Sequence, residues 1–162
     1  DLATACLLGE EMDTDTGVIQ AFRHNSKYRR DWVVRKIRQE CTGQRSDPVI
    51  GVWGLAYKAD TQSTKNSPAL ALMQSLPELS FRVYDPEVNL PNSPALQNCK
   101  SALEASKGVD ILAIMTPWEE FAAIDLKDLQ RTLAGDLIVD PFMIFDADDC
   151  ESNGFRHMGL GK

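Results

Sequence analysis

Residues 48–72, PVIGVWGLAYKADTQSTKNSPALAL, constrain the fold more than any other part of this sequence. They begin with a short apolar run at residues 49–55 that is partly β-branched and follows a proline, which is typical of a buried strand. Further on, Ser67 occupies a position suited to a helix N-cap, and Pro68 occupies the first helical position. Apolar residues then recur at helical spacing, so this stretch predicts a strand, a loop and a helix in that order.

The polar loop between this strand and helix, residues 56–66, exceeds the roughly two to six residues of most strand-to-helix connections. A loop at the carboxyl end of a strand, facing a helix N-terminus, is where open α/β sheets bind anionic ligands. The loop carries two lysines, Lys58 and Lys65. It is therefore our candidate anion site, and the alternative is that both lysines are solvated loop residues.

The composition places the chain among globular proteins and limits its partners. It has 162 residues, enough for a domain with its own core, and 43% of them are hydrophobic. The net charge of −7 argues against nucleic acid or an anionic membrane as a partner. No apolar run approaches the roughly 18 residues that span a bilayer, and no segment resembles a signal peptide, so we expect a cytoplasmic protein.

The cysteines and histidines give little support to a disulfide or a metal site. Four cysteines lie far apart and form no C-x-x-C pair, so we expect free thiols. With only two histidines, a zinc site has little support. The acidic run at residues 146–149 favours an exposed helix cap over a cation site, and His157 is interpreted as structural, with no visible partner.

The chain divides into a helical region and an α/β domain. Residues 1–12 are expected to form a helix, and residues 18–41 one long amphipathic helix with a basic second half. Residues 42–47 break that helix. We therefore assign residues 1–44 to a helical region that links domains or subunits, and residues 45–162 to the α/β domain.

Strands and helices alternate along the second domain. After the first strand, we expect strands at residues 81–84, 109–115, 137–139 and 155–157, and a loop at residues 87–98. The strands are apolar almost throughout rather than alternating, which is typical of a parallel sheet covered on both faces. Right-handed crossovers then predict a doubly wound, Rossmann-like fold. Gly51 and Gly54 give only G-x-x-G, which indicates close packing rather than a primary dinucleotide site.

The loop region also matches a known sequence signature. From Gly54 to Leu70 it reads G-L-A-Y-K-A-D-T-Q-S-T-K-N-S-P-A-L. This resembles the pattern G-L-A-F-K-x-x-T-D-D-x-R-x-S-P-A of the nucleotide-sugar 6-dehydrogenases, the UDP-glucose/GDP-mannose dehydrogenase family. Further matches follow in order: Tyr84-Asp85-Pro86, Thr116-x-Trp118-x-Glu120-Phe121, Leu137-Ile138-Val139-Asp140, and Phe155 with Met158-Gly159-x-Gly161.

The resemblance is strong over residues 48–162 and implies a division of labour in a larger enzyme. Family members join an N-terminal NAD-binding domain, through a long central helix, to a C-terminal domain that binds the nucleotide of a UDP-sugar or GDP-sugar. Residues 1–41 look like the end of the central region, which implies a homodimer through that region in the full-length enzyme. The chain then resembles a C-terminal portion, with the NAD domain and the nucleophilic cysteine outside it, so that by itself it catalyses nothing.

The resemblance also implies a chemistry. Similar enzymes oxidise the C6 hydroxymethyl group of the sugar to a carboxylate with two NAD+ per turnover, through a thioester on the cysteine. Their products feed polysaccharide synthesis.

Four residues of this chain receive roles from the family pattern. Lys58 matches the lysine that contacts the sugar nucleotide, and Tyr57 replaces the usual phenylalanine beside it. Lys65 falls where the family usually has an arginine that contacts the NAD pyrophosphate, a change that weakens bidentate phosphate binding. Asp1 would be the last residue of the motif G-G-x-C-x-x-K-D, where it orients water or takes a proton.

Departures from the pattern leave other interpretations open. Gln62 and Ser63 replace an acidic pair, and Phe142 stands near a position where many members have a substrate-binding arginine. Asp85 could meet a ribose, although an Asp-Pro turn is favoured. The two rival functions are a stand-alone, non-catalytic nucleotide-binding module and a dimerisation or assembly domain built on the basic helix.

Overall fold

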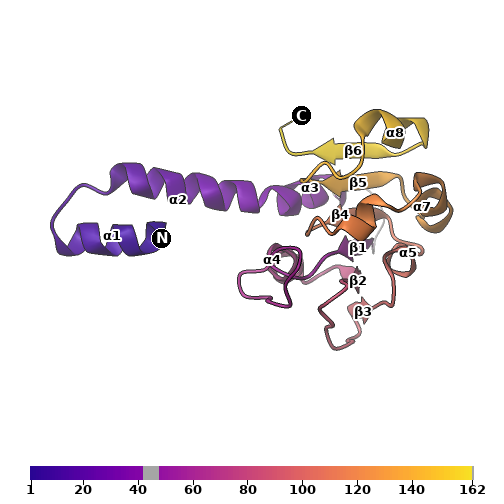
Figure 1. Cartoon of the computed structure of the whole chain (residues 1–162), viewed down its shortest axis with the longest axis horizontal. Helices are drawn as coiled ribbons and strands as arrows, with labels where there is room; N and C mark the ends of the chain where they lie inside the picture. The colour runs from indigo at the N-terminus through magenta and orange to yellow at the C-terminus, as the bar shows by residue number, and fades with distance from the viewer. Residues whose placement is uncertain (42–47, 162) are drawn as a thin grey trace. The chain divides into compact units, whose positions relative to one another are not determined.

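A computed structural model describes residues 1–41 and 48–161 and divides the chain into two compact units, residues 1–32 and residues 33–162. The first unit holds α1 (Leu2–Glu11) and α2 (Gly17–Arg30), which pack side by side (Figure 1). The helices approach closely at Gly9, where an added Cβ would lie 2.3 Å from the Thr16 methyl group. The predicted first helix is thereby confirmed.

The predicted single helix over residues 18–41 is wrong in one respect, because it is interrupted at Asp31. It forms α2 and then α3 (Trp32–Cys41). The break is slight, since the Asp31 amide still donates to the Lys27 carbonyl at 3.0 Å, although the Asp31 ψ angle is 6°. Val33 and Ile37 of α3 are buried, which places this helix in the second unit. The predicted domain boundary after residue 44 lies outside the described residues and stays a prediction.

The second unit is built on a six-stranded sheet in the order β3-β2-β1-β4-β5-β6, with every neighbouring pair parallel. Its strands are β1 (Val49–Trp53), β2 (Ser80–Tyr84), β3 (Leu96–Asn98), β4 (Ile111–Ile114), β5 (Leu137–Asp140) and β6 (Arg156–Gly159). The predicted doubly wound, Rossmann-like fold is confirmed. β3 was not expected, since its three residues fall at the end of the segment predicted as a loop.

Helices cover the sheet on both sides, with α3 and α4 on one face and α5 and α7 on the other (Figure 1). The remaining helices of this unit are α4 (Pro68–Ser75), α5 (Ala102–Ala105), α6 (Glu119–Ala122), α7 (Leu126–Thr132) and α8 (Ala147–Ser152). The central strands β4 and β5 are buried at every residue, which explains their unbroken apolar sequence. The strand order reverses between β1 and β4, and such a switch point is where this kind of sheet binds ligands.

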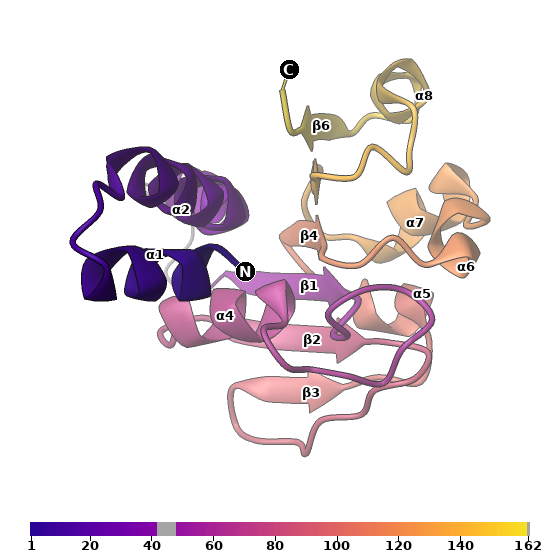
Figure 2. The same cartoon turned by 60° about the vertical axis from the view of Figure 1, so that its left-hand side comes forward.

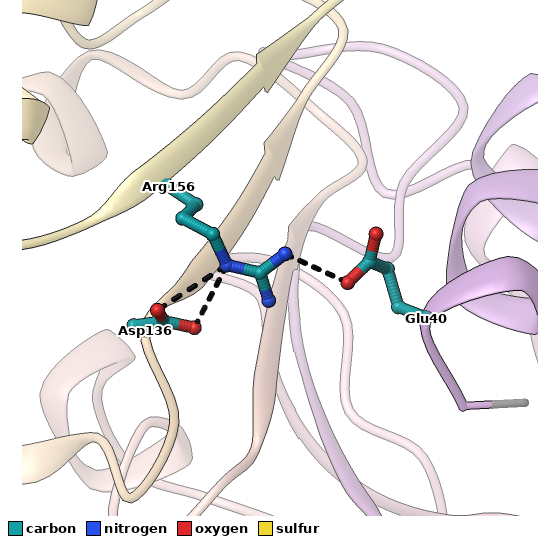
Figure 3. Close-up of polar contacts among 3 residues, drawn as sticks. All are labelled: Glu40, Asp136 and Arg156. Atoms are coloured by element: carbon teal, nitrogen blue, oxygen red, sulfur yellow. Dashed lines mark hydrogen bonds and ion pairs between the residues drawn. The ribbon is translucent and has the colours of Figure 1, made fainter. Parts of the chain in front are cut away.

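Polar contacts attach α3 to the sheet unit. Arg156 of β6 donates to Glu40 of α3 at 2.8 Å and pairs with Asp136 at 3.2 Å (Figure 3). Arg38 of α3 donates to the Ser75 carbonyl at the end of α4. Because the Arg156 side chain is 47% exposed, these pairs orient the helix more than they stabilise it.

Gly54 ends β1 in a conformation that only glycine adopts easily. Its φ is +90°, and an added Cβ would lie 2.4 Å from the Thr116 Cβ and 2.7 Å from the Thr116 amide nitrogen. This close approach joins the ends of β1 and β4 at the switch point.

We predict that Gly54→Ala destabilises the sheet unit by more than about 3 kcal/mol, because it combines a left-handed backbone with a clash against main-chain atoms. Gly108→Ala is the matched control, since Gly108 also has a positive φ (+70°) but open space around it. The Gly108→Ala substitution should lower the free energy of unfolding by about 1 kcal/mol. Urea unfolding followed by tryptophan fluorescence measures the stability of both variants, and equal losses would contradict the steric explanation.

Candidate functional site

The carboxylate of Asp85 lies at the centre of the edge formed by the carboxyl ends of the strands. Its Oδ2 atom accepts hydrogen bonds from the amides of Leu55 (2.6 Å) and Ala56 (2.9 Å), the residues that follow β1. The same oxygen accepts from the indole Nε1 of Trp118 at 3.1 Å, after β4. Asp85 itself follows β2 and is only 4% exposed, so one buried carboxylate connects the exits of three strands.

The second oxygen of Asp85 shapes its own turn. Oδ1 accepts from the amides of Glu87 and Val88, each at 2.9 Å. The turn interpretation of the Asp-Pro pair is thus confirmed. Because both oxygens are occupied by protein donors, the structure gives no support to a ribose contact by Asp85.

Two hydroxyl groups complete this edge of the sheet. Thr116 donates to the Ala56 carbonyl at 2.8 Å, and Ser67 donates to the Leu55 carbonyl at 2.7 Å. Ser67 also accepts from the Leu70 amide at 3.2 Å and therefore caps α4, as predicted. The carbonyl groups of Leu55 and Ala56, where the long loop begins, are thereby held in fixed positions.

The loop itself, residues 56–66, leaves the arrowhead of β1 and returns to α4 (Figure 2). The Tyr57 amide donates to the Ser63 carbonyl at 2.8 Å, which closes the loop on itself. Asp60 and Asn66 adopt left-handed φ angles of 59° and 62°, which their residue types tolerate well. The loop is therefore a defined turn structure rather than an extended connection.

The structure places three of the predicted site residues on this loop and leaves their side chains available. Tyr57, Lys58 and Lys65 are all exposed, and Tyr57 retains 54% of its accessible surface. An exposed aromatic ring beside two ammonium groups is suited to a ligand that combines a flat base with phosphates. Their roles stay predictions, because no ligand contact is on view.

A cavity of about 460 Å³ adjoins the loop, and Glu87 is the residue of its wall that sequence reasoning missed. It is lined by Asp60, Thr61, Gln62, Glu87 and Trp118. Gln62 donates to the Glu87 carboxylate at 3.0 Å, so the loop and the turn after β2 meet here. Carboxylate and amide groups recognise hydroxyl and amide groups of a ligand rather than its phosphates. The position of Glu87 two residues after Asp85 was the signal available in the sequence.

Asp1 belongs to the other unit of the chain. Its Oδ1 accepts from the amides of Ala3 (2.8 Å) and Thr4 (3.0 Å), so it caps α1. This capping role is sufficient to explain an aspartate at position 1, and a catalytic role is not needed to account for it. The catalytic role implied by the family pattern is untested.

His157 corrects the expectation of a histidine without a partner. Its Nε2 lies 3.3 Å from Oδ2 of Asp140, and both side chains are buried. Asp140 also accepts from the amides of Phe142 and Phe145 at 3.1 Å, which holds the turn after β5. The pair joins β5 to β6, so the structural role of His157 is confirmed.

Asp146 caps α8 through the amides of Asp148 and Asp149, as the cap interpretation required.

Three of the four thiols have raised pKa values, which disfavours the nucleophilic thiolate form. All four cysteines are free, as predicted. Burial, followed by the nearby charge of Asp140, raises the pKa of Cys150 to about 11. Burial also raises the pKa values of Cys41 and Cys99, so these three thiols stay protonated near neutral pH.

Within residues 1–41 and 48–161, no group of three or more His, Cys, Asp or Glu side chains is placed to hold a metal ion. In the same described part of the chain, no helix combines the length and the apolar character needed to cross a membrane.

An all-parallel sheet in this order, with a long loop and a cavity at its switch-point edge, defines a doubly wound, Rossmann-like class of domain. Residues 51–147, more than half of the chain, match the UDP-glucose/GDP-mannose dehydrogenase family, UDP binding domain. The chain belongs to this family, as its motifs had indicated.

Similar proteins agree with this assignment. The UDP-glucose 6-dehydrogenase of Rhizobium meliloti is 30% identical over 159 residues, which cover 94% of this chain and 36% of the relative. That of Rickettsia conorii is 29% identical, with 96% and 38% covered. The chain thus spans a little over a third of the length of these relatives.

The fold is shared with solved structures. A UDP-glucose dehydrogenase from the archaeon Pyrobaculum islandicum superposes with a TM-score of 0.75 at 17% identity, over 98% of this chain and 35% of that one. A UDP-D-ManNAc dehydrogenase from Pyrococcus horikoshii gives a TM-score of 0.67 at 23% identity, over 90% and 33%.

We predict that Asp85→Asn destabilises the sheet unit by about 3 kcal/mol, because an amide nitrogen must replace one of two oxygens that only accept hydrogen bonds. Hydrogen exchange at the Leu55 and Ala56 amides should accelerate as well. Asp146→Asn is the control, since asparagine caps a helix about as well as aspartate. Comparable stability of the two variants in urea would show that Asp85 is not the organising group.

Proposed function

We propose that this chain binds the nucleotide of a UDP-sugar at the loop over residues 56–66. The observation that carries the proposal is the exposed set Tyr57, Lys58 and Lys65 on a structured loop at the switch-point edge. Membership of a family whose matching domain is described as UDP binding supports the same ligand. In a chain with a net charge of −7, the two loop lysines supply the local positive charge that phosphate groups of the sugar nucleotide and of NAD require.

Each loop residue has a distinct part in this proposal. Lys58 binds oxygens of the sugar nucleotide near the reacting carbon, and Tyr57 provides a ring for stacking. Lys65 contacts the pyrophosphate of NAD. Its ammonium group acts as a point charge, whereas an arginine would form two parallel hydrogen bonds to a phosphate. Hydroxyl groups of the ligand then meet Glu87 and Gln62 in the adjoining cavity.

The whole protein, in this proposal, is an NAD-dependent UDP-sugar 6-dehydrogenase that serves polysaccharide synthesis. Oxidation of the C6 hydroxymethyl group to a carboxylate passes two hydrides to two NAD+, and water supplies the second oxygen. NAD binds mainly to a part of the enzyme other than this chain, and Asp1 orients water or takes a proton. The chain alone is expected to show no turnover, because the main NAD site and the nucleophilic cysteine belong to other parts of the proposed enzyme. Free thiols favour a cytoplasmic location.

We predict that UDP protects the amides of residues 57–67 from hydrogen exchange, and that Lys58→Ala abolishes this protection because the nucleotide loses the lysine proposed to bind it. Lys127→Ala is the control, since Lys127 is equally exposed but lies on α7. Exchange measured by mass spectrometry at saturating UDP provides the test. Unchanged exchange in the wild-type chain would remove the nucleotide assignment, and a matching effect of GDP would remove the preference for UDP.

We also propose that the helical unit, residues 1–32, mediates a homodimer. This is the dimerisation role named in the sequence analysis, here as a second function of the same chain. α2 has no buried residue, and large apolar side chains on both helices are exposed: Leu7, Leu8, Met12, Val18 and Phe22. A second copy is the favoured occupant because two identical apolar faces complement each other around a two-fold axis.

Phe22→Lys should convert the dimer to a monomer, because a charge replaces an apolar side chain that is 59% exposed in the single chain. His24→Lys is the control, two positions further along the same exposed helix. Light scattering coupled to size exclusion reports the mass. A wild-type chain that stays monomeric at high concentration, or a Phe22→Lys chain that stays dimeric, would refute this interface.

A further inference from the structure

A second cavity, of about 590 Å³, lies far from the candidate nucleotide loop. Its walls come from the first residues of β1 and β2, from the segment that leads into β3, and from the connection between α5 and β4. The charged and polar members of this wall include Arg82, Lys107, Asn92, Ser80 and Gln97. A cavity of this size accommodates a small organic molecule rather than a single ion.

The cavity is positively charged in a chain that is acidic overall. Arg82 and Lys107 both line it, and within residues 1–41 and 48–161 no acidic residue does. Among the described residues, no carboxylate forms an ion pair with either side chain. The nearby Glu104 carboxylate is occupied elsewhere, since its Oε2 accepts from the Lys100 amide at 2.8 Å.

Arg82 is held in place on the wall but is not fully satisfied. Its two terminal nitrogens donate to the Gln97 side chain and to the Glu104 carbonyl. Its Nε is buried and has no hydrogen-bond partner in the part of the chain that the structure describes. Both acceptors are neutral groups, so neither hydrogen bond neutralises the guanidinium. A positioned but unneutralised arginine is typical of a site that awaits an anion.

We propose that this cavity is a second ligand site, which binds a small phosphorylated molecule with its phosphate at Arg82 and Lys107. The remaining wall is partly apolar, with Val49, Phe81 and Leu96, and suits the carbon skeleton of such a ligand.

The site is separate from the nucleotide loop, and this proposal does not rest on the proposed function. Val49 and Ser80 begin β1 and β2 and are partners in register, whereas the nucleotide loop follows the last residues of the same strands. Five-residue strands separate the two ends by roughly 13 Å. In Figure 2 the amino ends of β2 and β3 lie at the side of the sheet away from the arrowheads.

A bound phosphate should stabilise the weakest part of the sheet. β3 has three residues, and α5 has four, so the elements around the cavity contribute little order of their own. A ligand held by Arg82 and Lys107 would connect β2 to the start of β4. We therefore expect ligand-dependent protection from hydrogen exchange at residues 80–82 and 94–98.

The test uses ribose 5-phosphate and inorganic phosphate as probes, with hydrogen exchange and calorimetric titration as readouts. Lys107→Gln should weaken ribose 5-phosphate binding about tenfold, because one of the two cations is lost. The matched control is Lys127→Gln, which removes the same charge from an exposed lysine outside the cavity and should leave the affinity unchanged.

Lys58→Ala separates the two sites, because it should abolish UDP protection of the nucleotide loop while ribose 5-phosphate still protects residues 94–98. No binding of either probe at millimolar concentration would overturn the proposal. An equal loss in Lys107→Gln and Lys127→Gln would also overturn it, since it would indicate general charge attraction. If inorganic phosphate binds as tightly as ribose 5-phosphate, the claim that the cavity also binds the carbon skeleton of a ligand is wrong.

Discussion

A carboxylate that is 4% exposed has to be compensated by hydrogen-bond donors, and Asp85 receives them from segments that follow three different strands. The amides of Leu55 and Ala56 would otherwise be buried donors at the start of the long loop, where each unsatisfied group costs about 1–3 kcal/mol. The same carboxylate fixes Trp118, which forms a wall of the adjoining cavity. The position of the loop, the shape of the cavity and the path of β1 into α4 therefore depend on the hydrogen bonds of one side chain.

The edge organised by Asp85 separates two kinds of polar group. Lys58 and Lys65 lie on the exposed part of the loop, whereas Asp60 and Glu87 line the cavity beside it. Phosphates favour the first set, and hydroxyl or amide groups favour the second. A nucleoside diphosphate carries both kinds of group a few ångströms apart, which a simple inorganic anion does not. In the proposed function, the site would therefore discriminate by the spacing of polar groups along a ligand, and not by net charge alone.

Local signals in the sequence were sufficient for most of the fold. Ser67 and Pro68 predicted the start of α4 because capping depends on residues close in sequence, and the apolar runs predicted β4 and β5 because those strands are buried on both faces. The break at Asp31 was missed because a change in one ψ angle leaves no compositional trace. The contact of His157 with Asp140, and the wall of the cavity around Glu87, depend on strand pairing and on a loop path, which no local pattern encodes.

The two units of the chain differ in how much apolar surface they bury to offset the loss of backbone entropy on folding. The sheet unit buries a continuous core that includes Trp53 and Phe121, whose rings lie 5.2 Å apart. In residues 1–32, all of which are described, only Cys6 and Thr16 are buried. A unit of this size cannot repay its conformational entropy from so little burial, since domains below about 40 residues usually need another source of stability. Its exposed apolar residues therefore support the proposed homodimer, in which a second copy would cover them.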